Sequence, residues 1–297
     1  VGKFAVGDFN ADGRADFAEI NFAPSVSAGL LWTAIPGGSG FTSTALPFVT
    51  GRPVSCAAAD VDGDGAPDLV VARSVLVPPN TVFFTPAPPE VLLNVGGAFV
   101  AGGALGMGAE TTTSAFAFHD MDGDLDMDLV VGFGAVRFNT AATFGPIIPA
   151  SGAGPSYAGG QRVIPCRLDG DAFPDVVTFS DSTIVCFFGG PGGLAIGPAL
   201  TSPTPGVYPF RDVQLIDSDG DGVDDLHVST IYVRLERFVL IAGALVQVSS
   251  EPMPSMFAYF SADIDGDGDR DYVHQTQQGS PASAGVGSIS YFRVRAV

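Results

Sequence analysis

The 297-residue chain is built around a short acidic segment, Asp60-Val-Asp-Gly-Asp-Gly-Ala-Pro-Asp68, which is followed at once by the apolar run Leu69-Val-Val-Ala. Five close copies of this segment lie elsewhere in the chain. The six copies begin at Asp8, Asp60, Asp120, Arg167, Asp217 and Asp263, at intervals of 52, 60, 47, 50 and 46 residues. A repeat with a period near fifty residues that covers the whole chain predicts an array of similar structural units.

Composition and strand pattern predict an all-β fold. Hydrophobic residues make up 46% of the chain and charged residues 15%, while 39 Gly and 23 Pro divide the sequence into many short segments. Helical periodicity is absent. In the first repeat, residues 4–7, 16–22, 29–35 and 41–48 have the character of four strands, and the acidic segment joins the first two as a hairpin. Each repeat therefore predicts one blade of about four antiparallel strands in a β-propeller.

The number of repeats predicts six blades in a single domain over residues 1–297, and seven blades are disfavoured because no gap is long enough to hide another. The blades are expected to begin near residues 1, 54, 114, 162, 210 and 257. The second repeat carries a proline-rich insertion at residues 77–80 and 86–89, which explains its longer spacing. The sixth repeat has signals for three strands, so either this blade is incomplete, or a neighbouring molecule or a removed segment completes it.

The charge of the chain is negative and concentrated. The net charge is −19 with only 13 Lys and Arg, which excludes nucleic acid as a partner and disfavours a membrane surface. Of 27 Asp, 25 lie in the six acidic segments. Six divalent cations would add twelve positive charges and bring the net charge from −19 to −7, an ordinary value for a soluble protein. No segment reaches the roughly twenty apolar residues of a membrane helix, so membrane insertion is not expected.

The acidic segments have the spacing of cation-binding loops. Carboxylates stand at positions one, three, five and nine, a backbone carbonyl is available at position seven, and Gly at position six permits a tight turn. This oxygen-only set favours Ca²⁺ over Mg²⁺, and zinc is disfavoured because the loops contain no Cys or His. The predicted ligands are Asp8, Asn10, Asp12, Asp16, Asp60, Asp62, Asp64, Asp68, Asp120, Asp122, Asp124, Asp128, Asp217, Asp219, Asp221, Asp225, Asp263, Asp265, Asp267 and Asp271.

Two copies depart from the pattern. The third has Leu125 in place of Gly but keeps its four carboxylates, so it is still expected to bind a cation. In the fourth, Arg167 replaces the first Asp. A guanidinium group there is expected to act as the counter-charge of Asp169, Asp171 and Asp175. The loop from Arg167 to Asp175 is therefore predicted to hold no cation, which leaves about five Ca²⁺ ions for the chain.

The first loop also matches a twelve-residue EF-hand pattern that ends at Glu19. An EF-hand needs a helix on each side, and neither residues 4–6 nor residues 17–20 have helical character. The other repeats carry Val71, Val131, Thr178, Val228 and His274 at the position of Glu19. The match is therefore interpreted as a coincidence.

The segments Asp-Phe-Asn-Ala-Asp-Gly-Arg-Ala-Asp16-Phe, Asp-Val-Asp-Gly-Asp-Gly-Ala-Pro-Asp68-Leu and Asp-Ile-Asp-Gly-Asp-Gly-Asp-Arg-Asp271-Tyr resemble FG-GAP or VCBS-like repeats. These repeats form integrin-α-type β-propellers and related fungal and bacterial proteins. The resemblance covers all six copies and implies a Ca²⁺-binding loop between the first two strands of each blade. Seven blades are more common in such propellers than the six counted here.

The functional expectation is binding, with Ca²⁺ in a structural role. No nucleophile, phosphate or zinc signature is present, and His119, His227 and His274 are expected to be structural, so the chain is not predicted to be an enzyme. Through the resemblance, we expect a secreted or cell-surface recognition module, most simply a carbohydrate-binding lectin or an adhesive protein. The alternatives are a structural or assembly protein of the cell surface, with homo-oligomers formed through the open sixth blade, and a polysaccharide-active lyase.

Aromatic residues give the lectin hypothesis little direct support. Sugar platforms favour Trp and Tyr, whereas this chain has one Trp, six Tyr and 23 Phe. The exposed candidates are Trp32, Tyr157, Tyr208 and Tyr232, each with packing as the simpler interpretation. Cys56, Cys166 and Cys186 show no metal spacing and are expected to be small buried residues. Because the chain begins at Val1, we interpret it as a mature or excised form of a secreted protein.

Overall fold

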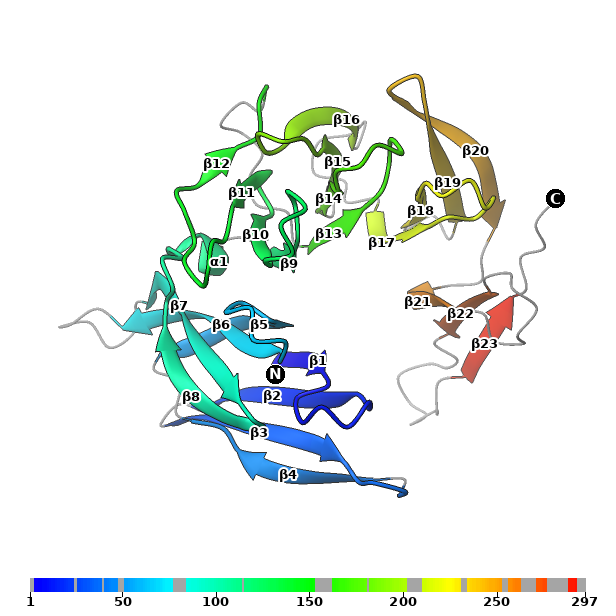
Figure 1. Ribbon diagram of the computed structural model, residues 1–297. Helices are drawn as coiled ribbons and strands as arrows, with labels where there is room; N and C mark the ends of the chain where they lie inside the picture. Colours follow the sequence, from blue (N-terminus) through cyan, green and yellow to red (C-terminus); the bar gives the residue numbers. More distant parts are fainter. Residues whose placement is uncertain are drawn as a thin grey trace. The chain divides into compact units, whose positions relative to one another are not determined.

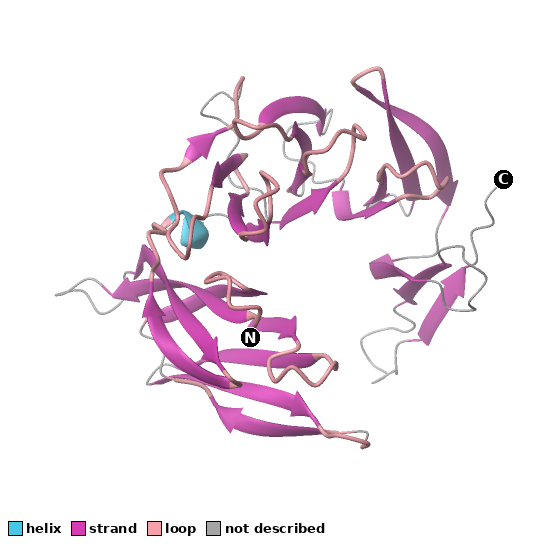
Figure 2. Ribbon diagram, in the orientation of Figure 1, coloured by secondary structure: helices cyan, strands magenta, loops and turns pink. Residues whose placement is uncertain are grey.

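Antiparallel sheets make up nearly all of the regular structure in the computed structural model (Figures 1 and 2). It describes residues 3–23, 26–38, 40–47, 51–76, 84–113, 115–152, 162–180, 182–201, 210–230, 234–252, 256–262, 271–276 and 288–292. These residues form six sheets, five with four strands and one with three, and each sheet follows chain order without crossovers. The predicted all-β propeller architecture is confirmed.

The described residues divide into two compact units. Unit one contains Val1–Val163 and Gly190–Leu194, and unit two contains Ile164–Gly189 and Ala195–Val297. The single domain expected from the repeat stays a prediction. The first strands of the six sheets begin at Lys3, Arg52, Phe116, Arg162, Phe210 and Met256, within two residues of the blade starts predicted from the sequence.

Unit one holds three sheets, which are coloured blue to green in Figure 1. Sheet one contains β1 (Lys3–Gly7), β2 (Asp16–Ala23), β3 (Val26–Ala34) and β4 (Phe41–Ala45). Sheet two contains β5 (Arg52–Ala59), β6 (Asp68–Leu76), β7 (Phe84–Val95) and β8 (Ala98–Gly103). Sheet three contains β9 (Phe116–His119), β10 (Asp128–Val131), β11 (Ala135–Arg137) and β12 (Ile148–Pro149), and the one-turn helix α1 (Glu110–Thr113) precedes it.

Unit two holds the other three sheets. Sheet four contains β13 (Arg162–Cys166), β14 (Asp175–Phe179), β15 (Thr183–Phe188) and β16 (Ala195–Thr201). Sheet five contains β17 (Phe210–Ile216), β18 (Asp225–Thr230), β19 (Arg234–Ile241) and β20 (Ala244–Pro252). Sheet six contains β21 (Met256–Ala262), β22 (Asp271–Thr276) and β23 (Ser288–Phe292), and the described residues supply no fourth strand for it.

The core of unit one is built on both faces of β6. Leu69, Val70 and Val71 are completely buried, and successive side chains of a strand point to opposite faces of its sheet. Leu69 and Val71 therefore pack in one cluster with residues of sheet one, while Val70 packs in a second cluster with residues of sheet three. The partners are Ala18, Ile20 and Leu31 on one side and Leu129 and Val131 on the other. This two-sided burial explains the uninterrupted apolar run after the second acidic segment.

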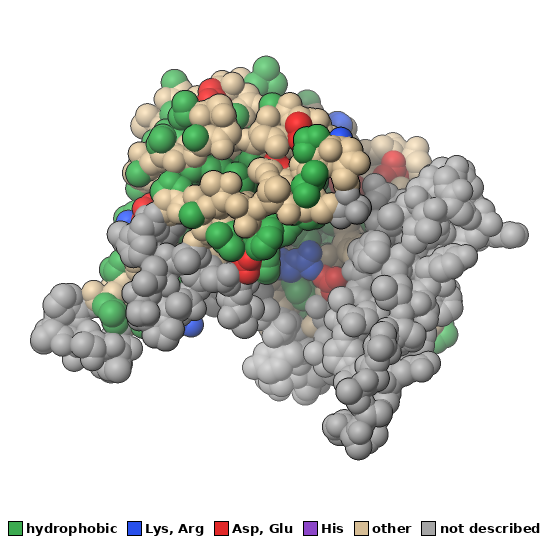
Figure 3. Space-filling view, turned by 90° about the horizontal axis from the view of Figure 1, so that it is seen from below, with side chains coloured by type: hydrophobic (Ala, Val, Ile, Leu, Met, Phe, Trp, Pro, Cys, Tyr) green, Lys and Arg blue, Asp and Glu red, His purple; other side chains and the backbone are tan. Residues whose placement is uncertain are grey.

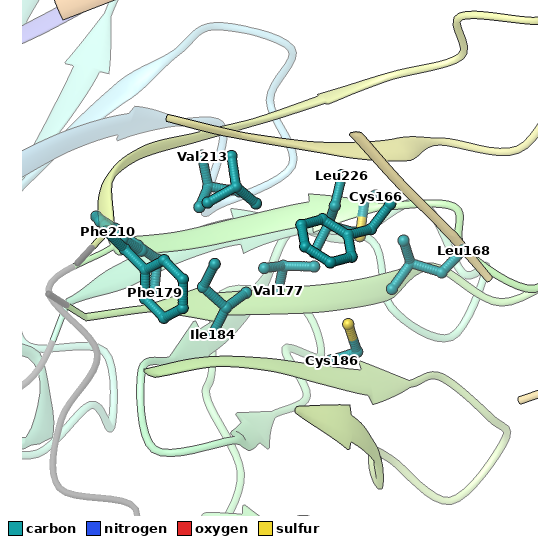
Figure 4. Packing of buried hydrophobic residues seen from close by; sticks show 11 residues of the cluster. Cys166, Leu168, Val177, Phe179, Ile184, Cys186, Phe210, Val213 and Leu226 are labelled. Atoms are coloured by element: carbon teal, nitrogen blue, oxygen red, sulfur yellow. The ribbon is translucent and has the colours of Figure 1, made fainter. Parts of the chain in front are cut away.

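The core of unit two lies between sheets four and five (Figure 4). It includes Val177 and Ile184 of sheet four and Val213 and Leu226 of sheet five. Cys166 and Cys186 are buried in the same cluster as free thiols, as the sequence predicted, whereas Cys56 of β5, for which burial was also predicted, is only half-buried. Burial raises the pKa of the Cys186 thiol to about 12, so this group behaves as a small apolar side chain.

The proline-rich insertion of the second repeat is in part a strand, which corrects the interpretation from sequence. Pro86 pairs with Ser74 and Phe84 pairs with Leu76, so β7 extends the hairpin that it forms with β6. Proline is tolerated there because β8 pairs only with the later part of β7, from Val91 onward. The earlier part is an edge, where no backbone N–H is required. Residues 77–83 lie outside the described residues.

Buried asparagine side chains join neighbouring sheets in unit one. The side-chain amide of Asn94, in β7, donates to the carbonyl oxygens of Phe9 (2.8 Å) and Pro67 (3.2 Å). Its oxygen accepts a hydrogen bond from the backbone N–H of Gly97 at 2.9 Å. Because Phe9 belongs to the first acidic segment and Pro67 to the second, this one side chain connects sheet two to the loop of sheet one.

Asn139 repeats this arrangement one sheet later. Its amide donates to the carbonyl oxygens of Val61 (3.0 Å) and Met127 (3.4 Å), which belong to the second and third acidic segments. The side-chain oxygen of Asn139, however, is buried without a hydrogen-bond partner. The two asparagine side chains therefore form different numbers of hydrogen bonds, three for Asn94 and two for Asn139.

We expect Asn94→Ala to destabilise unit one more than Asn139→Ala does. Each substitution leaves one buried and one part-buried carbonyl group without its donor, but only Asn94→Ala also removes the acceptor of the Gly97 N–H. Removing one partner of a buried hydrogen bond costs about 1–3 kcal/mol. The difference between the variants should be about 1 kcal/mol in urea-induced unfolding. Equal losses, or a larger loss for Asn139→Ala, would contradict this assignment.

Candidate metal-binding loops

Each acidic segment joins the first two strands of its sheet. We number them loop one (residues 8–16), loop two (60–68), loop three (120–128), loop four (167–175), loop five (217–225) and loop six (263–271). Loop six lies outside the described residues up to residue 270, and the side chain of Asp271 is not described, so its four predicted ligands stay predictions. Charged side chains are sparse among the coloured, described side chains in the view of Figure 3.

The first carboxylate of a loop is wrapped by the backbone of the same loop. Oδ1 of Asp60 accepts hydrogen bonds from the backbone N–H groups of Gly63 (2.8 Å) and Asp64 (3.1 Å), and Oδ2 accepts one from Gly65 (2.8 Å). Similar backbone bonds surround the first carboxylate of three other loops, at Asp8, Asp120 and Asp217. The wrapped carboxylate therefore forces the loop into a tight turn.

Carboxylates three and five continue the turn. Oδ1 of Asp62 accepts a hydrogen bond from the backbone N–H of Asp64 at 3.3 Å, and Oδ1 of Asp64 accepts one from Ala66 at 2.9 Å. Such bonds to the backbone two residues onward are the usual way in which aspartate stabilises a turn. They hold these carboxylates in place, so the loop is ordered by its own hydrogen bonds.

The ninth position is the most buried of the loop. Asp68 is completely buried and each of its oxygens has a backbone donor: Val61 donates to Oδ2 (3.0 Å) and Asn94 donates to Oδ1 (2.8 Å). The carboxylate thus bridges the start of its loop and the third strand of its sheet. The same two bonds occur at Asp16, Asp128 and Asp175. Sequence reasoning had assigned this position only a ligand role.

Burial also changes the acidity of these carboxyl groups. It raises the pKa of Asp68 and of Asp128 to about 6, while the backbone donors lower it only in part. The pKa of Asp175 is raised for the same reason. A buried carboxylate in this state gains from a nearby positive charge, because a cation favours the ionised form.

Three of the described loops bring carboxylates together. In loop two, oxygens of Asp60, Asp62 and Asp68 lie within 4.8 Å of one another, and in loop three the same holds for Asp120, Asp122 and Asp128. Loop five gathers positions one, three and five instead, namely Asp217, Asp219 and Asp221. Three carboxylate oxygens at this spacing form a donor set that suits a hard divalent cation such as Ca²⁺. Loop one has Asn10 at position three, whose side-chain oxygen accepts from the Asp12 N–H.

Two positions of the tight loops have left-handed backbone, although the sequence pattern pointed only to position six. Gly63 at position four has φ of 77° and Gly65 at position six has φ of 90°. Loop three has Gly123 and Leu125 at these positions, and the φ of Leu125 is 75°. Leu125 is therefore a residue with a Cβ atom in a conformation that favours glycine, and its side chain is 86% exposed.

Loop four differs from the prediction in the position of its guanidinium group. Nη2 of Arg167 donates to the carbonyl oxygen of Asp171 at 3.4 Å, and none of the ion pairs formed by described residues includes Arg167. The backbone of Arg167 instead exchanges two hydrogen bonds with Asp224 of loop five, at 2.9 and 2.6 Å. The expected contact with the loop carboxylates is not formed, while the absence of a cation from this loop stays a prediction.

A different arginine, not identified from the sequence, enters an acidic loop. Arg237 of β19 places Nη2 2.8 Å from Oδ2 of Asp219 and 2.8 Å from Oδ2 of Asp225, and its Nε donates to Asp225 at 3.0 Å. The third strand of sheet five carries three charged residues, Arg234, Glu236 and Arg237, so its sequence alone does not single out Arg237. Only the pairing of strands reveals that it faces loop five.

The remaining candidate residues are placed in the packing of the fold. Trp32 stacks on Phe17 with ring centroids 5.7 Å apart, and its indole N–H donates to Glu19 at 3.2 Å. Glu19 is thus bonded to an indole, in agreement with the rejection of the EF-hand match. His227 is 4% exposed, and burial with the nearby Arg237 lowers its pKa to about 4.

Other predicted residues fall at the surface or beyond the described part. His119 is exposed at the end of β9. The side chain of His274 is not described, and Tyr157, Tyr208 and Tyr232 lie outside the described residues. The one-turn helix α1 is far shorter than a membrane-spanning helix, and no other helix occurs among the described residues.

Comparison with known proteins identifies the repeat and the fold. Residues 8–71 match the family model of the FG-GAP-like repeat. A lectin of Agrocybe aegerita, described as recognising non-reducing terminal N-acetylglucosamine, is similar in structure with a TM-score of 0.61 and 14% identity, over 98% of this chain and 80% of the lectin. BBS1N, solved in complex with ARL6DN, is similar with a TM-score of 0.54 and 11% identity, over 93% of this chain and 75% of BBS1N. No curated protein sequence matches the chain.

We expect Leu125→Gly to stabilise the protein by roughly 0.5–1 kcal/mol, because relief of the left-handed conformation exceeds the added flexibility of glycine in the unfolded chain. Little burial is lost, since the leucine side chain is exposed. The measurement is urea-induced unfolding in the presence of a chelator. Gly65→Leu is the matched control at the same position of loop two, where a Cβ would meet no atom within 4 Å, and it should lower stability. If Leu125→Gly instead lowers the stability, the left-handed backbone of Leu125 is not a source of strain and the explanation is wrong.

Proposed function

We propose that this chain is a Ca²⁺-binding β-propeller that acts as a recognition module, with a glycan or a protein surface as its ligand and the cell exterior as its place of action. The observation that carries the proposal is the convergence of carboxylates in loops two and three, each with a buried aspartate at position nine. The FG-GAP-like match over residues 8–71 supports it, because the loops that such repeats contain are often calcium-binding.

The proposed role of Ca²⁺ is structural. In loop two, the ion would be held by Asp60, Asp62 and Asp68, and it would supply positive charge to carboxylates that the fold has brought together. Loops three and one are the next candidates in unit one, and loop six is the candidate in unit two. The sequence also predicted a site in loop five, and loop four is proposed to take up none. Binding rather than catalysis is proposed for the chain as a whole.

A glycan is the favoured ligand class. The support is the similarity of fold to a lectin over nearly the whole chain, which is a likeness of architecture at 14% identity. A protein surface is the alternative ligand, since BBS1N has the same architecture and was solved with a protein partner. One further observation favours an assembly role. Sheet six has three strands among the described residues, and an open strand edge can pair with a strand of another chain.

We expect Ca²⁺ to raise the melting temperature and a chelator to lower it. At about 1 mM Ca²⁺, sites with the affinity of extracellular modules each add roughly 0.5–1.5 kcal/mol. Asp62→Asn should reduce this gain, since it removes a ligand charge but keeps the side-chain oxygen that accepts the Asp64 N–H. Glu236→Gln, a half-buried residue outside the loops, is the control and should leave the gain unchanged. A melting temperature that is indifferent to both Ca²⁺ and chelator would refute the proposal of calcium loading.

For the ligand, we expect binding to a panel of immobilised glycans, including glycans that end in N-acetylglucosamine, and loss of that binding in chelator. The physical reason is that Ca²⁺ stabilises the blades that would carry the binding surface. The matched measurement is light scattering of the same protein as a function of concentration. If no glycan of the panel binds and the protein associates with increasing concentration, the proposal of a glycan ligand is rejected and an assembly role is favoured.

A further inference from the structure

We propose that Arg237 is a built-in counter-charge for loop five, and that its guanidinium group excludes a divalent cation from this loop. This inference rests on the proposed Ca²⁺ binding by the other loops, and it revises the number of sites predicted from the sequence. It concerns a residue of the third strand, outside the repeated acidic motif.

The guanidinium group contacts two carboxylates that a cation in loop five would need. Nη2 of Arg237 lies 2.8 Å from Oδ2 of Asp219 and 2.8 Å from Oδ2 of Asp225. The Nε group donates to the same oxygen of Asp225 at 3.0 Å. Asp225 is nearly buried and the arginine side chain is about three-quarters buried, so water screens this contact less than it screens a surface pair.

The position of Arg237 is specific to sheet five. In each sheet, the residue two places after the ninth loop position pairs with one residue of the third strand. In the first four sheets that partner is apolar, whereas in sheet five the partner of His227 is Arg237. The four apolar partners are Leu31, Val91, Val136 and Cys186. The same place in the fold thus changes from a core position to a cationic one.

The contacts of Asp225 change together with this substitution. In loops one to four, the ninth aspartate accepts backbone bonds from its loop and from its third strand. In loop five, Oδ2 of Asp225 keeps the loop bond, from the backbone N–H of Ser218, and also accepts from the Ser218 hydroxyl and from Arg237. Among the hydrogen bonds of the described residues, none from the backbone of the third strand reaches Asp225. Ser218 stands at position two, which is apolar and buried in the other described loops, at Phe9, Val61, Met121 and Leu168.

The clustering of oxygens agrees with this difference. Loops two and three gather positions one, three and nine, while loop five gathers positions one, three and five and leaves Asp225 out of the group. A divalent cation that joined Asp219 to Asp225 would have to displace the guanidinium group, because like charges at this distance repel strongly. Arginine stays charged at all accessible pH values and has five donors, so it is a durable substitute.

The test is to count bound Ca²⁺ by equilibrium dialysis at about 5 mM, above the dissociation constants of extracellular calcium modules. Arg237→Gln should bind one more ion per chain than the unchanged protein. Arg234→Gln, on the same strand and bonded to Ser250 in the exposed part of sheet five, is the matched control and should bind the same number as the unchanged protein. A variant that binds no additional ion contradicts the inference.

A second pair of variants does not depend on the folding of Arg237→Gln. Asp219→Asn in loop five should leave the number of bound ions unchanged, whereas Asp62→Asn at the same position of loop two should reduce the number or the affinity of bound ions. If Asp219→Asn also loses an ion, loop five is a calcium site and Arg237 does not exclude the ion. If the unchanged protein and Arg237→Gln both bind none, the proposed calcium loading fails together with this inference. If the unchanged protein binds Ca²⁺ and Arg237→Gln binds no additional ion, only the inference about Arg237 is rejected.

Discussion

The buried aspartate at the ninth loop position is the interaction on which the first four sheets depend. Its two oxygens accept backbone hydrogen bonds from two parts of the chain, the beginning of its loop and the end of the third strand. An uncharged side chain of similar size could not satisfy both donors with full strength, since bonds to a carboxylate are stronger than bonds between neutral groups. One carboxylate therefore sets the geometry of a loop and the register of a sheet.

The sequence was sufficient to predict the architecture because the repeat and the strand pattern agree. The first strands begin within two residues of the expected blade starts, and Leu69 to Val71 are buried as their apolar run indicates. The strand formed by residues 84–89 was missed because three prolines suggested an irregular insertion. Proline is compatible with a strand wherever the neighbouring strand has ended, and the length of β8 is not visible in the local sequence of β7.

The loops were predicted in part. Their spacing correctly indicated that carboxylates converge, as they do in loops two and three. The spacing alone could not distinguish an aspartate that would face a cation from one that accepts backbone hydrogen bonds, because both kinds occupy the same positions of the motif. Arg167 was predicted to be the counter-charge of the carboxylates in loop four because it lies within the motif itself. Arg237 is twelve residues after Asp225, and only strand pairing brings it to loop five. Contacts that depend on cross-strand register are the part that a local motif omits.

The distribution of arginine between the loops has a consequence for how the two units would lose structure. In unit one, loops two and three carry clustered carboxylates, and their counter-charge would have to come from solution. In unit two, the cluster of loop five already contains a covalently attached cation, and Arg167 adds another beside loop four. Calcium depletion would then loosen the blades unevenly, beginning at residues 8–128 while residues 162–252 keep their shape. Under the proposed calcium loading, a fluctuating calcium concentration would thus change the stability of one part of the chain and leave that of residues 162–252 unchanged.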